Sequence, residues 1–101
     1  MGEIRHLQDG KRGAFVYFVD GQQLAEMVYV MYASKRMVIE HTEVDESLKG
    51  QNIGKKLLES LVHYVREQGI KVVPYCPFAK AMLEKTKEWQ DIVEVKSDGV
   101  N

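Results

Sequence analysis

The residues with the clearest chemical potential form the segment Lys49-Gly50-Gln51-Asn52-Ile53-Gly54, which lies between a predicted strand and a predicted helix. Glycine lets a backbone approach a ligand closely, and the first turn of a helix presents unpaired N–H groups at its positive end. Lys49, Lys55 and Lys56 add positive charge at the same place. This combination predicts a site for an anionic group, and a solvated loop closed by a tight turn is the alternative.

The spacing of the glycines excludes two common nucleotide-binding motifs. A P-loop, G-x-x-x-x-G-K-S/T, needs one more residue between its glycines than separates Gly50 from Gly54, and a hydroxyl residue where Lys56 follows Lys55. The dinucleotide fingerprint G-x-G-x-x-G is absent as well.

The single cysteine, Cys76, follows a predicted strand and directly precedes Pro77, so we expect it at the N-cap of the second helix. A helix N-terminus favours the thiolate, which is the nucleophilic form of cysteine. Cys76 is therefore a candidate catalytic residue, either as an acyl acceptor or as a neighbour of the reacting group. A small buried hydrophobic residue is the alternative.

Two further candidates for acid–base chemistry, His41 and Glu43, lie near the end of the third predicted strand, beside the glycine segment. Strand alternation places both on one face. Either could remove a proton from an ammonium group. A half-exposed histidine without function is the alternative. His6 and His63 are expected to be structural or exposed, and one cysteine with three scattered histidines offers no zinc-ligand spacing, so we expect no metal.

In the first half of the chain apolar and polar residues alternate, which is typical of strands. These strands must position the candidate residues. Residues 14–19 are aromatic and β-branched and stop at Asp20-Gly21, a two-residue hairpin signal. Residues 23–32 form the partner strand, and residues 36–44 return after a turn. This pattern predicts a three-strand antiparallel meander.

The period becomes helical after Gly50. Six apolar residues form one stripe, namely Ile53, Leu57, Leu58, Leu61, Val62 and Val65. Gly69 is suited to end this helix, and residues 70–75 form a short strand reached by the helical crossover.

Pro77 opens a second helix, whose inner face we assign to Phe78, Ala81 and Met82. Trp89 packs near its end, and residues 92–95 form a last strand. The predicted order is strand–strand–strand–helix–strand–helix–strand, an α/β (α+β) fold with a mixed, mostly antiparallel sheet.

Length and composition bound the class of protein. The 101 residues, 11.6 kDa, allow one domain, expected over residues 1–101. Fourteen Lys and Arg against fifteen Asp and Glu give a formal charge of −1, so we expect no general binding of nucleic acid or anionic membrane. One cysteine, no apolar run near the ~20 residues that span a bilayer and no signal-like N-terminus favour a cytoplasmic protein.

The segment from Lys49 to Gly54 resembles the acetyl-CoA pyrophosphate loop of the GNAT N-acetyltransferase superfamily, Q/R-x-x-G-x-G/A. Lys49 stands where the superfamily has Gln or Arg, Asn52 where it has Gly, and Gly54 at the final small residue. Two of the three signature positions therefore differ from the superfamily pattern. Lysine keeps the charge, and asparagine tolerates a positive φ best among non-glycine residues, so the loop shape is feasible.

Two flanking segments extend the resemblance over nearly the whole chain. His41-Thr42-Glu43-Val44 before the loop and Pro74-Tyr75-Cys76-Pro77-Phe78 after the helix resemble the small YjdJ-type branch of the superfamily. The resemblance implies a minimal GNAT-like fold. The hairpin at Asp20-Gly21 leaves no room for the helices that the superfamily usually carries between its first strands, which implies an open acceptor side.

The resemblance also implies acetyl-CoA as cosubstrate. The backbone N–H groups of residues 51–55 would hold the pyrophosphate, the pantetheine arm would run beside residues 42–44, and lysines at the two helix starts and just beyond would reach the ribose phosphate. The implied binding residues are Thr42, Val44, Lys49, Gly50, Gln51, Asn52, Ile53, Gly54, Lys55, Pro77, Lys80 and Lys85.

The implied activity is acetyl transfer to an amine, by direct attack in preference to a relay through Cys76. A backbone N–H near Val44 would polarise the carbonyl, and His41 or Glu43 would take the amine proton. The acceptor stays open between a protein N-terminus, a lysine, a polyamine and a small amine, and the protein is expected to be a monomer or a weak homodimer. The alternatives are an acyl-CoA-binding regulatory module without turnover and a fold-only interaction domain.

Overall fold

The computed structural model describes residues 2–94 of the chain, which form one five-stranded sheet in the order β1-β2-β3-β4-β5. The first four strands pair antiparallel and β5 pairs parallel with β4. The strands are β1 (Gly2–Asp9), β2 (Arg12–Val19), β3 (Gln22–Ala33), β4 (Arg36–Val44) and β5 (Lys71–Pro74). The mixed, mostly antiparallel α/β fold predicted from the sequence is confirmed.

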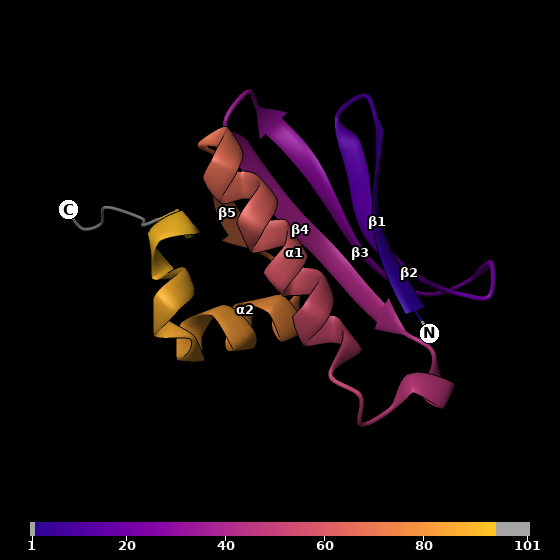
Figure 1. Ribbon diagram of the computed structural model, residues 1–101. Coiled ribbons are helices and arrows are strands. Elements are labelled where there is room, and N and C mark those ends of the chain that lie inside the picture. The colour runs from indigo at the N-terminus through magenta and orange to yellow at the C-terminus, as the bar shows by residue number, and fades with distance from the viewer. Residues whose placement is uncertain (1, 95–101) are drawn as a thin grey trace.

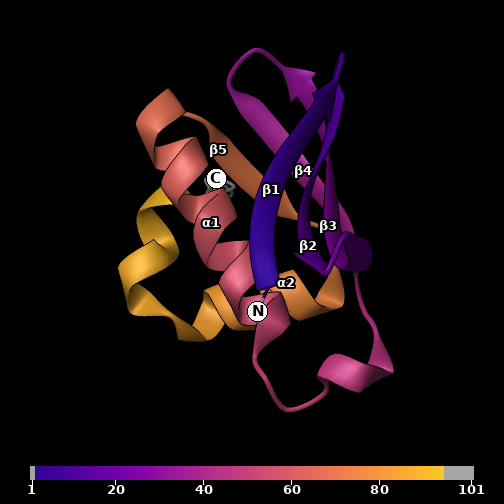
Figure 2. The same cartoon turned by 45° about the vertical axis from the view of Figure 1, so that its right-hand side comes forward.

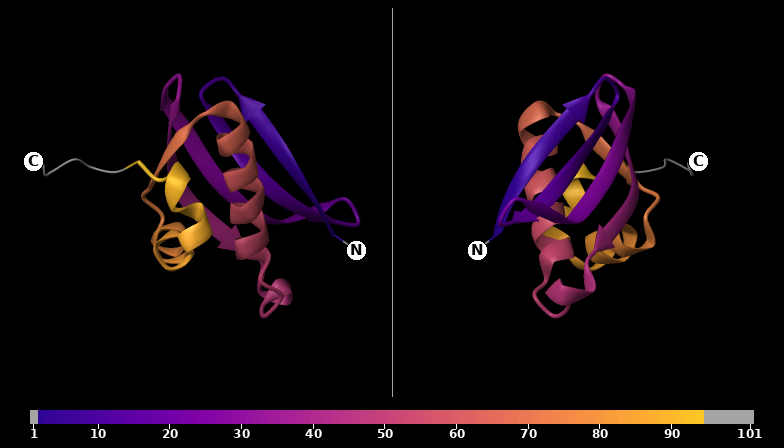
Figure 3. Two further views of the ribbon diagram at one scale, coloured as in Figure 1. Left: turned by 60° about the vertical axis from the view of Figure 1, so that its left-hand side comes forward. Right: turned by 90° about the vertical axis from the view of Figure 1, so that its right-hand side faces the viewer.

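The helices follow the meander and gather on one face of the sheet. They are the 3-10 turn η1 (Glu46–Leu48), α1 (Ile53–Gln68), α2 (Pro77–Lys85) and the 3-10 helix η2 (Lys87–Ile92). Figure 1 shows α1 lying across the strands with α2 beside its N-terminal end, and the turned views of Figures 2 and 3 show no described helix over the opposite face. We call these the helix-covered face and the open face. None of the described helices is long and apolar enough to cross a bilayer.

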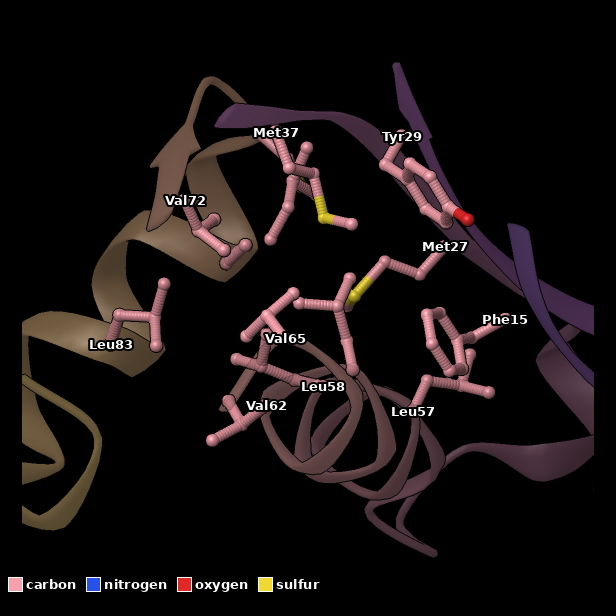
Figure 4. Close-up of a cluster of buried hydrophobic side chains, with 14 of the residues drawn as sticks. Phe15, Met27, Tyr29, Met37, Leu57, Leu58, Val62, Val65, Val72 and Leu83 are labelled. Atoms are coloured by element: carbon pink, nitrogen blue, oxygen red, sulfur yellow. The ribbon is translucent and has the colours of Figure 1, made fainter. Parts of the chain in front are cut away.

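The core lies between the sheet and α1. All six residues of the predicted α1 stripe are buried, and they pack against strand residues such as Phe15, Met27, Tyr29 and Met37 (Figure 4). Leu83 of α2 closes the same cluster. Gly69 ends α1 with a φ of 71°, as the sequence predicted.

The hairpin between β2 and β3 is formed by the predicted residues. Asp20 and Gly21 have φ values of 50° and 79°, the pair of positive values that a tight turn of right-handed twist requires. Between this hairpin and the end of β4 there is no helix. The predicted absence of helices between the first strands therefore holds.

Three details differ from the sequence prediction. The first strand, β1, was missed because it is an edge strand that is mostly exposed and charged. The last strand is reduced, within the described residues, to η2 and a single bridge between Val72 and Val93, while Val95 lies outside the described residues. The inner face of α2 carries buried Ala79 and Leu83 in place of Phe78 and Ala81, because α2 meets the core on the side that continues from buried Cys76. Of the predicted residues, Met82 packs partly against the core.

A bulge in β4 decides which residues face the helices. Ile39 pairs with Tyr29 and His41 pairs with Val28, so Glu40 is an extra residue. Ile39 is buried in the core, and without the extra residue the side chain of residue 41 would follow it there. The bulge instead turns Thr42 toward the helix-covered face and His41 toward the open face.

Candidate functional site

The glycine segment forms a tight connection into α1. Gly50 has a φ of 84°, and Asn52 adopts the left-handed conformation with φ 58° and ψ 34°. Asparagine is the non-glycine residue that reaches this region at least cost, so the backbone shape expected for the loop is present without the family's glycine.

The start of α1 offers three backbone donors. The first helical hydrogen bond runs from the N–H of Lys56 to the carbonyl of Asn52, 3.1 Å. The N–H groups of Ile53, Gly54 and Lys55 therefore have no acceptor within the helix. The N–H of Gln51, which the sequence assigned to the same group, instead donates to the carbonyl of Leu48, 3.1 Å, because it closes the turn after η1.

A groove of about 320 Å³ runs from these donors to the end of β4. Its lining includes seven of the predicted binding residues, and it also includes Phe78, which the sequence had placed in the core. The lining residues are Thr42, Val44, Leu48, Lys49, Gly50, Asn52, Ile53, Gly54 and Phe78. The P-x-C-P-F segment was the signal that could have identified Phe78.

Gly54 and Phe78 lie against each other at the α1 end of this groove. A Cβ atom on Gly54 would lie 2.8 Å from the Cζ atom of Phe78, closer than side chains approach one another. Phe78 is itself 38% exposed, and its ring lies over the helix start rather than in the core. Glycine at position 54 therefore lets the ring of Phe78 pack against the first turn of α1.

Asp45 fixes the chain where it leaves β4 toward the loop. Its carboxylate accepts hydrogen bonds from the N–H of Ser47 at 3.0 Å and from the Ser47 hydroxyl at 2.5 Å. These bonds, the hydroxyl first, lower the pKa of Asp45. The turn η1 is thus capped by a carboxylate that stays ionised at neutral pH.

Cys76 is the N-cap of α2 and is buried, with 3% of its surface exposed. Its sulfur lies 3.2 Å from the hydroxyl oxygen of Thr42, in hydrogen-bond contact. The N–H groups of Tyr75 and Cys76 both donate to the carbonyl of Ile39, at 3.0 and 3.1 Å. The pairing of β5 with β4 ends at this point. Farther along β4, Thr42 lines the groove.

His41 and Glu43 lie on the open face of β4, the side opposite Thr42 and Cys76. Nε2 of His41 is 3.2 Å from Oε2 of Glu26, a β3 residue absent from the sequence-based candidates. Glu26 is also directly opposite Glu43 in the strand register. The structure thus brings His41 and Glu43 together with Glu26, and separates them from Cys76 by the thickness of the strand.

The remaining candidates lie around or away from the groove. Pro77 occupies the first turn of α2 beside Cys76. Lys80 lines a different cavity, of about 540 Å³, with Tyr75 and the end of the described chain. Lys85 is in the last turn of α2, so the two lysines are not brought to the groove. Among residues 2–94, no three His, Cys, Asp or Glu residues are grouped as metal ligands.

Comparison with known proteins defines the class. The family model described as GCN5-related N-acetyl-transferase matches residues 14–92. The solution structure of a GCN5-like protein from Staphylococcus aureus is 35% identical, with a TM-score of 0.70 over 93% of this chain and 89% of that one. The mixed sheet and the glycine segment at the start of α1 are thus the fold of an acetyltransferase. The chain belongs to the GCN5-related N-acetyltransferase family.

More distant structures share the fold alone. A GNAT acetyltransferase from Elizabethkingia anophelis with acetyl-CoA bound is 12% identical, with a TM-score of 0.65 over 85% of this chain and 74% of that one. The ribosomal-protein-S18-alanine N-acetyltransferase of Escherichia coli is 20% identical, with a TM-score of 0.64 over 76% of this chain and 52% of its own. No curated protein matches the sequence.

Proposed function

We propose that the protein transfers an acetyl group from acetyl-CoA to an amine, by direct attack of the amine. One observation carries this proposal: the groove on the helix-covered face reaches β4 at Thr42 and Val44, and His41 and Glu43 lie on the other face of the same stretch of strand. A donor bound in the groove and an acceptor on the open face would meet at this end of β4.

The residues of the groove fit a diphosphate with an extended arm. The free N–H groups of Ile53, Gly54 and Lys55 would hold the pyrophosphate, with Lys49 adding charge. At Gly54 a larger residue would collide with the ring of Phe78, which lies against the first turn of α1. The backbone between Thr42 and Val44 would pair with the pantetheine arm. Acetyl-CoA supplies an activated acetyl group, whose bond to sulfur breaks as the bond to the amine nitrogen forms.

The open face supplies the proton acceptor. An amine must lose its proton to attack, and His41 is an imidazole that is half exposed on the side from which an acceptor would approach. Glu43, on the same face, is the second candidate base. A backbone N–H near Val44 would polarise the acetyl carbonyl.

Cys76 is a neighbour of the reaction in this proposal. Its thiol is buried and bonded to the Thr42 hydroxyl, which supports a role in shaping the groove over one as acyl carrier. The proposal includes a cytoplasmic location, since a lone free cysteine suits a reducing compartment.

Incubation of the protein with acetyl-CoA tests the mechanism. The acceptors are spermidine, a lysine-containing peptide and a peptide with a free N-terminus, and acetylated product is measured by mass spectrometry. We expect turnover of at least one amine, a loss of about 100-fold in kcat/KM in His41→Gln, and less than tenfold loss in Cys76→Ala. Without an acceptor, the intact mass should show no stoichiometric acetyl adduct at Cys76. An adduct discharged by an amine at the turnover rate would contradict direct attack.

A further inference from the structure

We infer that Glu26 is a positioning residue for His41, so that the two form an acid–base pair on the open face of the sheet. The inference rests on the proposed function, since it assigns His41 the role of proton acceptor. It concerns a residue that no sequence motif identified and that reaches the site from another strand.

The register of the strands brings the two side chains together. His41 pairs with Val28, and Glu26 is two residues away on β3, on the same face. Its Oε2 atom lies 3.2 Å from Nε2 of His41, and its Oε1 atom accepts a hydrogen bond from Nε2 of Gln23 at 3.1 Å. Both carboxylate oxygens of Glu26 thus have hydrogen-bond partners, and Gln23 fixes the carboxylate that orients the imidazole of His41.

The pairing determines which nitrogen of His41 is free. An ionised carboxylate only accepts hydrogen bonds, so Nε2 must carry a proton in this contact. In the neutral ring the lone pair then lies on Nδ1. An acceptor ammonium would give its proton to Nδ1, and the resulting imidazolium would keep its Nε2–H bond to Glu26 until the proton passes to water.

The placement of Glu26 is poorly explained by stability. It lies directly opposite Glu43, and like charges in this position destabilise a strand pair. The contact between His41 and Glu26 is itself partly exposed, with 29% of the Glu26 side chain and 48% of the His41 side chain accessible, and exposed contacts of this kind contribute little to folding. The contribution of Glu26 to folding is therefore small, and its effect on His41 explains its position better.

The surroundings leave room for an acceptor. Beside His41, which is not itself a lining residue, Glu26 and Glu43 line an open cavity of about 530 Å³ that also includes Val44, a lining residue of the groove. The cavity is of the size that holds small ligands. A cationic amine entering it would lie between these carboxylates and the end of β4.

Two measurements test the pair, and the first does not depend on turnover. Long-range proton–nitrogen NMR spectra of the His41 ring, at about pH 8 where an unperturbed histidine is neutral, report its tautomer. We expect the Nε2–H form alone in the wild-type protein and in Glu3→Gln, a control that removes an ion-paired glutamate from another strand. Glu26→Leu should give a mixture of the two tautomers. A mixture in the wild-type protein, or an unchanged tautomer in Glu26→Leu, would overturn the inference.

The second measurement is a double-mutant cycle with the panel amine that turns over fastest. We expect Glu26→Leu to lower kcat/KM by about tenfold to a hundredfold. In the His41→Gln background the Glu26→Leu change should have no further effect. An equal loss in both backgrounds would show that Glu26 does not act through His41. If no amine reacts, the proposed function is wrong and His41 has no catalytic role. The NMR result would still show whether Glu26 orients the His41 ring.

Discussion

The two faces of β4 differ in burial and in the polar groups that they carry. On the helix-covered side, Thr42 contacts a buried thiol and lines a narrow groove that ends at the donors of α1. On the open side, its neighbour His41 is half exposed and bonded to a carboxylate. One strand thus separates a side suited to binding from a side suited to proton transfer, and the bulge at Glu40 sets which residue faces which way.

The largest difference between the faces should be in stability. Ile39 is fully buried on the helix-covered face, whereas its neighbour Val38 is only partly buried on the open face. We expect Ile39→Ala to lower the free energy of unfolding by about 3 kcal/mol, because it leaves a cavity, and Val38→Ala by about 1 kcal/mol. Urea denaturation measures both. Equal losses would show that the open face is packed by something else, such as a second copy of the chain.

A smaller effect is expected at the loop. Asn52 has a positive φ, which a β-branched residue adopts only with strain. We expect Asn52→Val to cost about 1 to 2 kcal/mol in unfolding free energy and to weaken acetyl-CoA binding, while Asn52→Gly leaves the affinity unchanged. Calorimetry on the two variants checks this. Equal affinities in Asn52→Val and Asn52→Gly would mean that the left-handed turn does not shape the groove.

The smallest effect concerns an ionisable residue on the helix-covered face. His6 stacks on Phe15 with ring centroids 4.1 Å apart, and its Nε2 is 2.6 Å from the hydroxyl of Tyr29. Burial lowers the pKa of His6. Below pH 6.5 the unfolded chain therefore takes up a proton more readily than the folded one, so stability is present above that pH and falls as the pH drops through the lowered pKa.

Urea denaturation between about pH 7 and pH 5 measures this dependence. His6→Gln should flatten the slope of stability against pH, whereas His63→Gln, a change on the exposed side of α1, should leave it as it is. A slope that persists unchanged in His6→Gln would assign the pH dependence to other groups.

The sequence predicted the helix-covered side of the site better than the open side. The apolar stripe of α1, the hairpin at Asp20-Gly21 and the loop are local patterns, in which residues a few positions apart act together. Glu26 and His41 are fifteen residues apart, and their contact depends on a strand register that is shifted by one bulged residue. No local pattern indicates that shift. Alternation therefore predicted that His41 and Glu43 share a face, but it could not indicate whether this is the helix-covered or the open face.

Two other elements, β1 and α2, were harder to predict from the sequence for related reasons. The strand β1 has few β-branched residues because its outer edge and much of its surface face water, which removes the alternating signal. The helix α2 has apolar residues on several sides, and Phe78 lies over Gly54 rather than in the core. Only the packing of α2 against β4 and β5 distinguishes these sides.

Calorimetric titration of acetyl-CoA tests the division between the two faces most directly. Gly54→Glu places a carboxylate and its side chain where the groove meets Phe78 and the free N–H groups, and we expect a loss of affinity of at least about 100-fold. His63→Glu, which adds the same charge on the exposed side of α1, and His41→Gln, on the open face, should bind acetyl-CoA as the wild-type protein does. An unchanged affinity in Gly54→Glu, or a comparable loss in His41→Gln, would contradict the account.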